Sequence, residues 1–222
     1  MEPRAQQRWQ TKVWLPLSLL CLFLMACGHS PELRHPLYGN LMPAVRKVLL
    51  LQPEVSIIEE LADGSRLWQE EESQAAGVHI RQAVVQRLSE KRLAIQVADP
   101  AVVAMLDAQA VQALFRAVNK SIHLHVYGPQ PIPNKLKSFD YQLGPIETLL
   151  AASGADALVL AIAYQFESPN RPKTWLAIAL VEPGGRIVWY NTQAASADIE
   201  LSSLTGAHTL VRLTLAQFGD SS

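Results

Sequence analysis

The order of apolar and polar positions along the chain predicts an alternating series of strands and helices. Short apolar runs bounded by proline or glycine are typical of strands, and apolar residues that recur every three or four positions are typical of helices. The predicted strands cover residues 48–51, 55–61, 93–97, 157–166, 175–181 and 186–190. The predicted helices cover residues 70–92, 100–123, 146–153 and 201–218. In the last helix, the positions expected to be buried are Leu204, Ala207, Val211 and Phe218.

Capping and turn residues support several of these boundaries. The Asp99-Pro100 pair is a typical helix start, because aspartate caps free amides and proline fits the first helical turn. Gly154 is a typical residue at a helix C-terminus, and Gly184-Gly185 predicts a hairpin turn between the last two strands. The predicted fold class is therefore α/β, with a mixed β-sheet of about five to six strands that ends in an antiparallel meander and packs against about four helices.

The first 27 residues divide into a basic segment, an apolar stretch and a short motif that ends at Cys27. A basic segment, residues 1–12, precedes an uncharged apolar stretch, residues 13–26. This stretch is shorter than the roughly 20 apolar residues that a membrane-spanning helix needs, so it fits a signal peptide better. The sequence LMACG, in which Ala26, Cys27 and Gly28 match best, resembles the lipobox of bacterial lipoproteins. The resemblance implies cleavage before Cys27 and lipidation of its sulfur.

This leader divides the chain into a signal peptide (1–26), a lipidated tether (27–45) and a single α/β domain (46–222). Residues 28–44 hold three prolines, two glycines and no periodic apolar pattern, which is typical of a tether. Two or three acyl chains hold a protein firmly on a membrane. Because Gly28 rather than aspartate follows the cysteine, resemblance to enterobacterial sorting rules implies the periplasmic face of the outer membrane; the inner membrane is the less favoured alternative.

Composition and charge narrow the range of partners. Of the 222 residues 49% are apolar and 18% charged, the balance of a folded protein. Both cysteines, Cys21 and Cys27, lie at the beginning of the chain, so the body can form no internal disulfide. Removing residues 1–26 takes away three of the 19 basic and one of the 20 acidic side chains, which leaves 16 and 19. That net charge does not favour nucleic acid or an anionic membrane surface as a partner. We expect no cofactor.

Two later motifs resemble known envelope domains. The run GADALV at 154–159, followed by LVEPGGRIVW at 180–189, resembles the signature of TolB amino-terminal-like and curli-export-lipoprotein-like domains. The segment FDYQLGP at 139–145 further resembles an uncharacterised group of proteobacterial lipoproteins. Glu182 stands where these domains usually have aspartate. The resemblance spans about residues 46–218 and implies a periplasmic accessory or assembly module. It implies no catalytic activity and no catalytic residues.

Two groups of residues are candidates for chemistry. His123 and His125 would share a face in a strand, but in a helix they point about 200° apart and cannot share a metal. The apolar stripe of the preceding residues favours the helix. Asp140 and Asp156 could form a carboxylate pair and Ser153 could be a nucleophile, but all three lie at turns or helix ends, where these residue types are common. The sequence therefore predicts neither a metal site nor catalytic residues.

An aromatic segment is the candidate partner surface. Phe139, Tyr141 and the nearby Tyr127 could form an exposed patch that anchors a protein partner. The alternative, which we favour, is that these rings plug the end of the sheet.

Small residues in two predicted strands suggest a further surface. Ala161 and Ala163 share one face of their strand, and Ala177 and Ala179 share one face of the next. A sheet face lined by all four alanines could accept a closely packed helix, a partner or an apolar ligand.

These observations give three hypotheses for function. The leading one is a membrane-anchored periplasmic lipoprotein that acts as a non-enzymatic assembly or interaction module of the cell envelope, with an envelope protein as partner. The alternative is a carrier for a lipid or other apolar ligand, which requires the alanine-lined face to be open. A periplasmic hydrolase is a distant third.

Lipidation can be tested at the cysteine itself. Cys27→Ala should leave the precursor without acyl chains and uncleaved by the lipoprotein peptidase, whereas Cys21→Ala should be processed normally. Mass spectrometry of the amino terminus measures both properties. An unmodified wild-type terminus at another residue would contradict the lipoprotein assignment.

Overall fold

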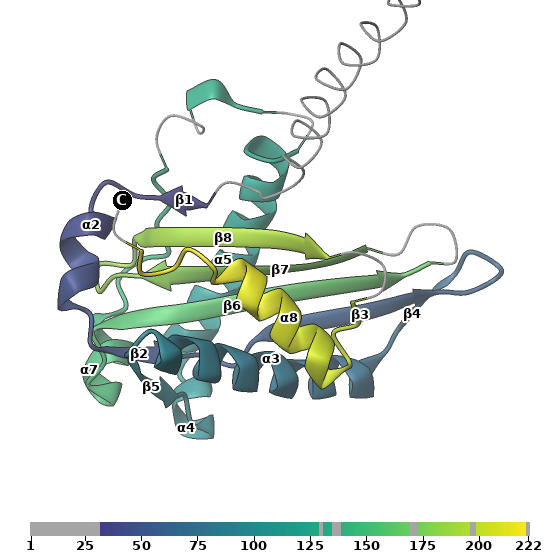
Figure 1. The fold of residues 1–222 in the computed structure, drawn as a ribbon, viewed down its shortest axis with the longest axis horizontal. Helices are drawn as coiled ribbons and strands as arrows, with labels where there is room; N and C mark the ends of the chain where they lie inside the picture. Colours follow the sequence, from purple (N-terminus) through teal and green to yellow (C-terminus); the bar gives the residue numbers. More distant parts are fainter. Residues whose placement is uncertain (1–31, 129–130, 135–138, 169–172, 196–198, 221–222) are drawn as a thin grey trace, which may run out of the picture.

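The domain is a mixed β-sheet between two layers of helices (Figure 1). The computed structural model describes residues 32–128, 131–134, 139–168, 173–195 and 199–220. The predicted leader and Cys27 lie outside these ranges. Within them, no helix is both long and apolar enough to cross a bilayer.

The predicted strands and helices occur in the predicted order, and the structure adds short elements that the sequence pattern did not predict. The strands are β1 (Leu33–Arg34), β2 (Lys47–Leu50), β3 (Glu54–Glu60), β4 (Arg66–Trp68), β5 (Ala94–Val97), β6 (Ala157–Glu167), β7 (Lys173–Val181) and β8 (Ile187–Ala195). The helices are α2 (Tyr38–Leu41), the 3-10 turn η1 (Met42–Ala44), α3 (Glu70–Glu90), α4 (Pro100–Val103), α5 (Leu106–His125), α7 (Glu147–Ser153) and α8 (Leu204–Thr214). The added elements are β1, α2, η1 and β4. The predicted α/β class with a C-terminal antiparallel meander, β6-β7-β8, is confirmed.

Strand β6 lies at the centre of the sheet and pairs with three other strands. The main path of the sheet has the order β1-β8-β7-β6-β2-β5, and β3 also pairs with β6. The first residues of β6 pair with β2, and residues 162–167 pair with β3, both in parallel. Pro53, between β2 and β3, cannot donate to a sheet ladder, which fits a break between two strands that share one edge of β6. Strand β4 extends the sheet beyond β3.

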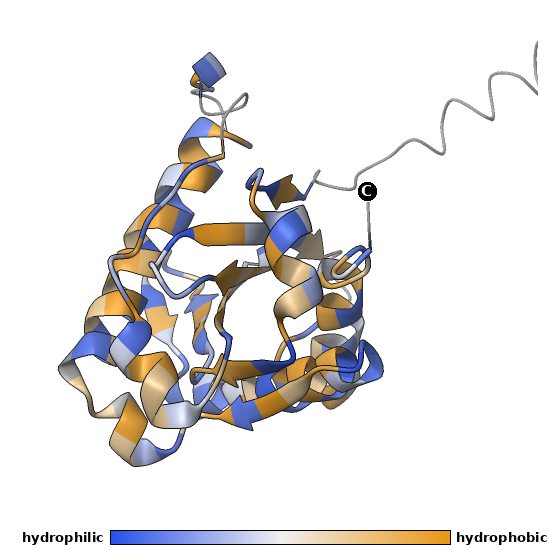
Figure 2. Ribbon diagram, turned by 90° about the vertical axis from the view of Figure 1, so that its left-hand side faces the viewer, coloured by the Kyte–Doolittle hydropathy of each residue, from blue (hydrophilic) through white to orange (hydrophobic). Residues whose placement is uncertain are grey.

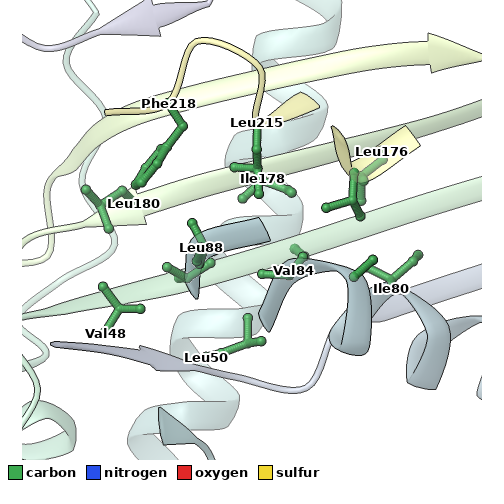
Figure 3. Packing of buried hydrophobic residues seen from close by; sticks show 14 of the residues in the cluster. Val48, Leu50, Ile80, Val84, Leu88, Leu176, Ile178, Leu180, Leu215 and Phe218 are labelled. Atoms are coloured by element: carbon green, nitrogen blue, oxygen red, sulfur yellow. The ribbon is translucent and has the colours of Figure 1, made fainter. Parts of the chain in front are cut away.

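The first core lies between the sheet and helices α3 and α8. Figure 3 shows Ile80, Val84 and Leu88 of α3 directed at side chains of β7 and β2. Phe218, just after α8, contacts Trp189 edge-on with the ring centroids 4.9 Å apart. The helices on both sides of the sheet carry hydrophobic and hydrophilic residues along their length (Figure 2), as expected when one face is buried.

The second core lies on the opposite side of the sheet, under α5 and α7. Val111, Phe115 and Ile122 of α5 are buried there together with Leu149 of α7. The irregular segment 139–146 closes this core between the helices and the β7–β8 hairpin. The sheet is therefore buried on both sides at its centre, which explains the near-continuous apolar runs of β6 and β7.

The helix predicted from residue 100 to residue 123 is two helices. Asp99 caps α4 as expected, with its side chain accepting a hydrogen bond from the Val102 amide. The backbone of Met105 is extended (φ −63°, ψ 136°) and separates α4 from α5. The apolar pattern continues across this break, which is why the sequence did not reveal it.

Leu204, expected in the core, is exposed. Ser203 caps α8 by accepting a hydrogen bond from the Gly206 amide, so Leu204 is the first helical residue and points away from the core. Helix α8 also ends earlier than predicted, and Phe218 is buried from the turn that follows it.

Part of the expected tether belongs to the fold. Residues 32–45, the described part of the segment, form β1, α2 and η1 against the domain. Strand β1 pairs with the edge of β8, and the Trp189 indole N–H donates to the Glu32 carboxylate at 3.0 Å. Tyr38 is buried, and its hydroxyl accepts a hydrogen bond from the Gly219 amide. The sequence did not predict this packing because the segment has no apolar periodicity. A few residues are enough to hold it against the domain.

Two glycines with positive φ offer a matched test of backbone packing. A Cβ at Gly185 (φ +87°) would lie 1.6 Å from the Gly144 carbonyl oxygen, whereas a Cβ at Gly64 (φ +79°) would meet nothing within 4 Å. We expect Gly64→Ala to cost about 1 kcal/mol from backbone strain alone. Gly185→Ala should cost at least about 3 kcal/mol, because backbone must also move. Urea unfolding measures the free energy of unfolding of both variants. Equal losses would contradict the close approach of Gly185 to the Gly144 carbonyl.

Candidate interaction surface

Two of the three rings of the predicted aromatic patch are buried. Phe139 is 5% exposed and Tyr141 is 7% exposed. Their ring centroids lie 5.4 Å apart, and the Phe139 ring lies 6.3 Å from that of Tyr190. Tyr127 is half-buried, and burial raises the pKa of its hydroxyl. Phe139 and Tyr141 therefore pack in the second core, as expected for the alternative favoured above, and Tyr127 packs against the same core while partly exposed.

Backbone hydrogen bonds hold this plug against the β7–β8 hairpin. The Leu143 amide donates to the Gly185 carbonyl at 2.7 Å, and the Ile187 amide donates to the Tyr141 carbonyl at 2.9 Å. The Glu182 carboxylate accepts hydrogen bonds from the amides two and four residues later, at 3.0 and 3.2 Å. Glutamate thus caps the turn at the position where the resembling domains usually have aspartate.

A single alanine-lined sheet face does not exist. Strand register places Ala161 opposite Ile178 and Ala163 opposite Leu176, while Ala177 and Ala179 face bulky residues of β6. The alanines of β6 therefore lie in the first core and those of β7 in the second. All four are buried. The carrier hypothesis loses the open face that it required.

The two histidines lie in α5 and do not share a site. His123 packs with its ring centroid 4.7 Å from that of Trp175, and burial lowers its pKa. His125 is two residues further along the same helix. Among the described residues, no group of three or more His, Cys, Asp or Glu side chains could hold a metal ion.

The residues considered for catalysis have structural partners. The Ser153 hydroxyl is buried and donates to carbonyls of its own helix. The Asp156 carboxylate accepts hydrogen bonds from the amides of Arg46 and Lys47, which lower its pKa. Asp140 lies 3.6 Å from the Arg186 guanidinium instead. The two aspartates therefore hold different segments of the fold.

An exposed apolar surface lies at the β3–β4 hairpin instead. Strand β4 is the outermost strand beyond β3, and all three of its residues are exposed. Trp68 is 57% exposed and Leu67 is 48% exposed. We call this edge, residues 66–68, the β4 edge. It lies at the opposite end of the sheet from β1 and α2 (Figure 1).

The Trp68 ring has a fixed orientation although it faces solvent. Its indole N–H donates to the Ser73 hydroxyl at 3.2 Å. That hydroxyl is held by its own bonds, since it donates to the Gln69 carbonyl at 2.6 Å and accepts from the Ile57 amide at 3.0 Å. An oriented, exposed tryptophan is the type of side chain that most often anchors protein interfaces, because little freedom is lost on binding.

The backbone of β4 has hydrogen-bonding groups that point away from β3. The Gln69 amide bonds the Ile57 carbonyl, and the Leu61 amide bonds the Ser65 carbonyl. Hydrogen-bonded pairs recur at every second residue of an antiparallel ladder, so Leu67 is the next residue to bond β3. The amides and carbonyls of Arg66 and Trp68 therefore face outward, where a further strand could add.

The surroundings of the β4 edge are acidic. Helix α3 begins directly after it with Glu70-Glu71-Glu72, whose charges favour the helix N-terminus. A neighbouring cavity of about 510 Å³ is lined by the acidic residues Glu59, Glu60, Glu72, Glu167 and Glu200. Acidic side chains therefore predominate around the β4 edge, which itself carries one cation, Arg66.

Sequence reasoning missed the β4 edge because a three-residue strand shows no usable alternation. A signal was present in the run Arg66-Leu67-Trp68, which follows the Gly64 turn and precedes three glutamates. Two large apolar residues in so polar a context are unusual for a loop. Whether they were buried could not be decided without the position of α3.

The chain matches no family model and no curated protein. Similar solved structures include the LpoB C-terminal domain from Salmonella enterica, with 14% identity and TM-score 0.29, covering 71% of this chain and 94% of that one. The lipoprotein GNA1162 from Neisseria meningitidis has 15% identity and TM-score 0.35, with 79% and 97% covered. The LpoB C-terminal domain from Escherichia coli has 14% identity and TM-score 0.27, with 72% and 98% covered. These TM-scores indicate a loose likeness, and the resemblance to TolB-like domains stays a prediction.

The plug can be tested by truncating its rings. Phe139→Ala and Tyr141→Ala should each cost about 3–5 kcal/mol of unfolding free energy, because both rings fill the second core. Leu114→Ala is the control, since Leu114 lies on α5 and is 45% exposed. Its loss should stay below about 1 kcal/mol. Urea unfolding decides the matter, and wild-type stability of the two ring variants would contradict the plug.

Proposed function

We propose that the chain is a lipid-anchored periplasmic protein that acts without catalysis, as an assembly or interaction module of the cell envelope. The anchor rests on the lipobox at Cys27, which lies outside the described residues. We further propose that the β4 edge binds an extended, basic segment of an envelope protein. Residues 32–45, the first described residues after Cys27, pack at the end of the sheet opposite β4, so the β4 edge points away from the end that would carry the anchor.

The observation that carries the interaction role is Trp68. A ring of this size normally lies in a core, yet it is more than half exposed while its N–H is fixed by Ser73. Among the described residues no group of three or more His, Cys, Asp or Glu side chains offers a metal site as an alternative. An anchored protein with a rigid aromatic edge is suited to hold another protein.

The shape and charge of the occupant follow from the edge itself. Outward-facing amides and carbonyls at Arg66 and Trp68 favour a strand that adds to the sheet, in which main-chain hydrogen bonds give affinity. The acidic residues around the edge favour lysine and arginine in that strand, because complementary charge guides encounter and orientation. An extended basic segment meets both requirements.

Photo-crosslinking in intact cells tests this function on the full-length chain. A photo-reactive residue at Leu67 should give a defined adduct, whereas the same residue at Leu114 on α5 should not. Trp68→Ala should strongly reduce the Leu67 adduct, since loss of an anchoring tryptophan commonly weakens binding by about thirtyfold or more. Its effect on stability should be about 1 kcal/mol or less, because the ring is mostly exposed.

Mass spectrometry of the adduct locates the contact on the partner. A basic segment of an envelope protein supports the proposal. Equal adducts from positions 67 and 114, or an adduct unchanged by Trp68→Ala, would refute the β4 edge as the binding surface. An acidic contact segment would refute the proposed charge.

A further inference from the structure

A basic cavity lies at the end of the domain that carries β1 and α2. Its volume is about 720 Å³, and its walls come from residues 34–46, the turn after α3 and the segment after α8. The charged lining residues are Arg34, Arg46, Lys91, Arg92 and Asp220. Apolar atoms of Met42, Val45 and Leu93 complete the walls. A positive site with an apolar wall suits an anion that carries a less polar body.

Two of these cations form no close ion pair within the described part of the chain, although the charge of Arg46 contributes, after the backbone amides of Arg46 and Lys47, to the lowered pKa of Asp156. Asp220 is engaged by Lys91, with Nζ and Oδ1 3.1 Å apart. Arg34 donates to the carbonyls of Asp220 and Gln217 and stacks over the Tyr38 ring. Arg46 and Arg92 form no ion pair with any described residue.

Arg46 and Arg92 are close together because of strand pairing. They precede β2 and β5, which run parallel, and the Ala94 amide donates to the Arg46 carbonyl at 2.8 Å. Both residues line the same cavity and both are exposed. Arginine binds the oxygens of a phosphate group in a bidentate manner, so two arginines that line one cavity form a candidate phosphate site.

The backbone of Arg92 supplies an independent observation. Its φ of +65° makes it the one non-glycine residue with positive φ in the described ranges. It ends α3 in a turn where the Arg92 amide bonds the Ser89 carbonyl and the Leu93 amide bonds the Leu88 carbonyl. Glycine is the usual residue there, as at Gly154 after α7 (φ +60°). Keeping arginine in this conformation costs roughly 1 kcal/mol, which points to a role for its side chain.

The position of the cavity along the chain indicates where such a phosphate could come from. Arg34 follows Cys27 by seven residues, a span of at most about 25 Å. Lipidation of Cys27, which rests on the proposed function, places the cavity within reach of membrane headgroups. The overall charge of the mature chain argued against an anionic membrane surface, but this cavity concentrates positive charge locally.

We propose that this cavity binds a phosphate group between Arg46 and Arg92, with the remainder of the ligand over Met42 and Leu93. An anionic phospholipid headgroup and a soluble phosphate compound share this chemistry. The proposal requires no movement of the fold, because the cavity already exists in the structure.

Calorimetric titration of the purified full chain in neutral detergent micelles tests the site. The probes are short-chain phosphatidylglycerol, short-chain phosphatidylcholine and inorganic phosphate. We expect phosphatidylglycerol to bind more tightly than phosphatidylcholine and to weaken with added salt. Arg46→Gln and Arg92→Gly should each weaken its binding about tenfold, the loss expected for one charge-assisted pair of hydrogen bonds.

Arg92→Gly separates binding from folding. It removes the guanidinium but relieves the backbone conformation, so its melting temperature should equal or exceed that of the wild type. Arg212→Gln, which removes an exposed arginine of α8 outside the cavity, is the charge-matched control and should change affinity less than about twofold.

Each outcome decides a point. Binding of phosphatidylglycerol or inorganic phosphate that depends on Arg46 and Arg92 supports the site, and the tighter of these two probes identifies a lipid or a soluble phosphate as the source. No binding of any probe, or an equal loss in Arg212→Gln, overturns the proposal. A mass spectrum of the same sample reports the state of Cys27, so failure of the anchor is distinguished from failure of the cavity.

Discussion

Burial of the central strands on both faces is the constraint on which the rest of the structure depends. Each alanine of β6 or β7 in the middle of the sheet lies opposite a bulky aliphatic residue on the neighbouring strand. This register divides the small and bulky side chains evenly between the two faces of the sheet. Helices α3 and α8 can therefore approach one face while α5 and α7 approach the other. A shift by one residue would exchange the two faces and leave both cores badly filled.

The filled sheet determines where function can be located. The segment 139–146 closes the second core, and its aromatic rings serve packing. No open apolar face remains in the described meander for a ligand. Binding sites are therefore expected at the ends of the sheet, where short elements such as β4 and α2 leave backbone groups or charged side chains accessible.

The two ends differ in charge and structure. The end that carries β1 and α2 contains the cavity with Arg46 and Arg92, whereas the β4 edge is surrounded by glutamates. A nearly neutral net charge conceals this separation. On a lipid-anchored protein the arrangement would keep the basic end near the membrane and present Trp68 to a partner beyond it. In this proposal the charge separation orients the protein at the membrane and attracts the partner to the β4 edge.

The sequence by itself determined the elements with strong local signals. Helix α3, the cap at Asp99, the αL residue at Gly154 and the β6-β7-β8 meander were all predictable, because propensity, capping and periodicity act over a few residues. The motif at Cys27 that resembles a lipobox is likewise local; it lies outside the described residues and stays a prediction.

Only the tertiary structure decided which faces meet. Register set the alanines on opposite sides, the packing of residues 32–45 joined a proline-rich segment to the domain, and α3 left Trp68 exposed. The pairing of β2 with β5 brought Arg46 and Arg92 together across 45 intervening residues. Such contacts depend on long-range pairing and on the volume available between layers, and neither is encoded in any short stretch of sequence.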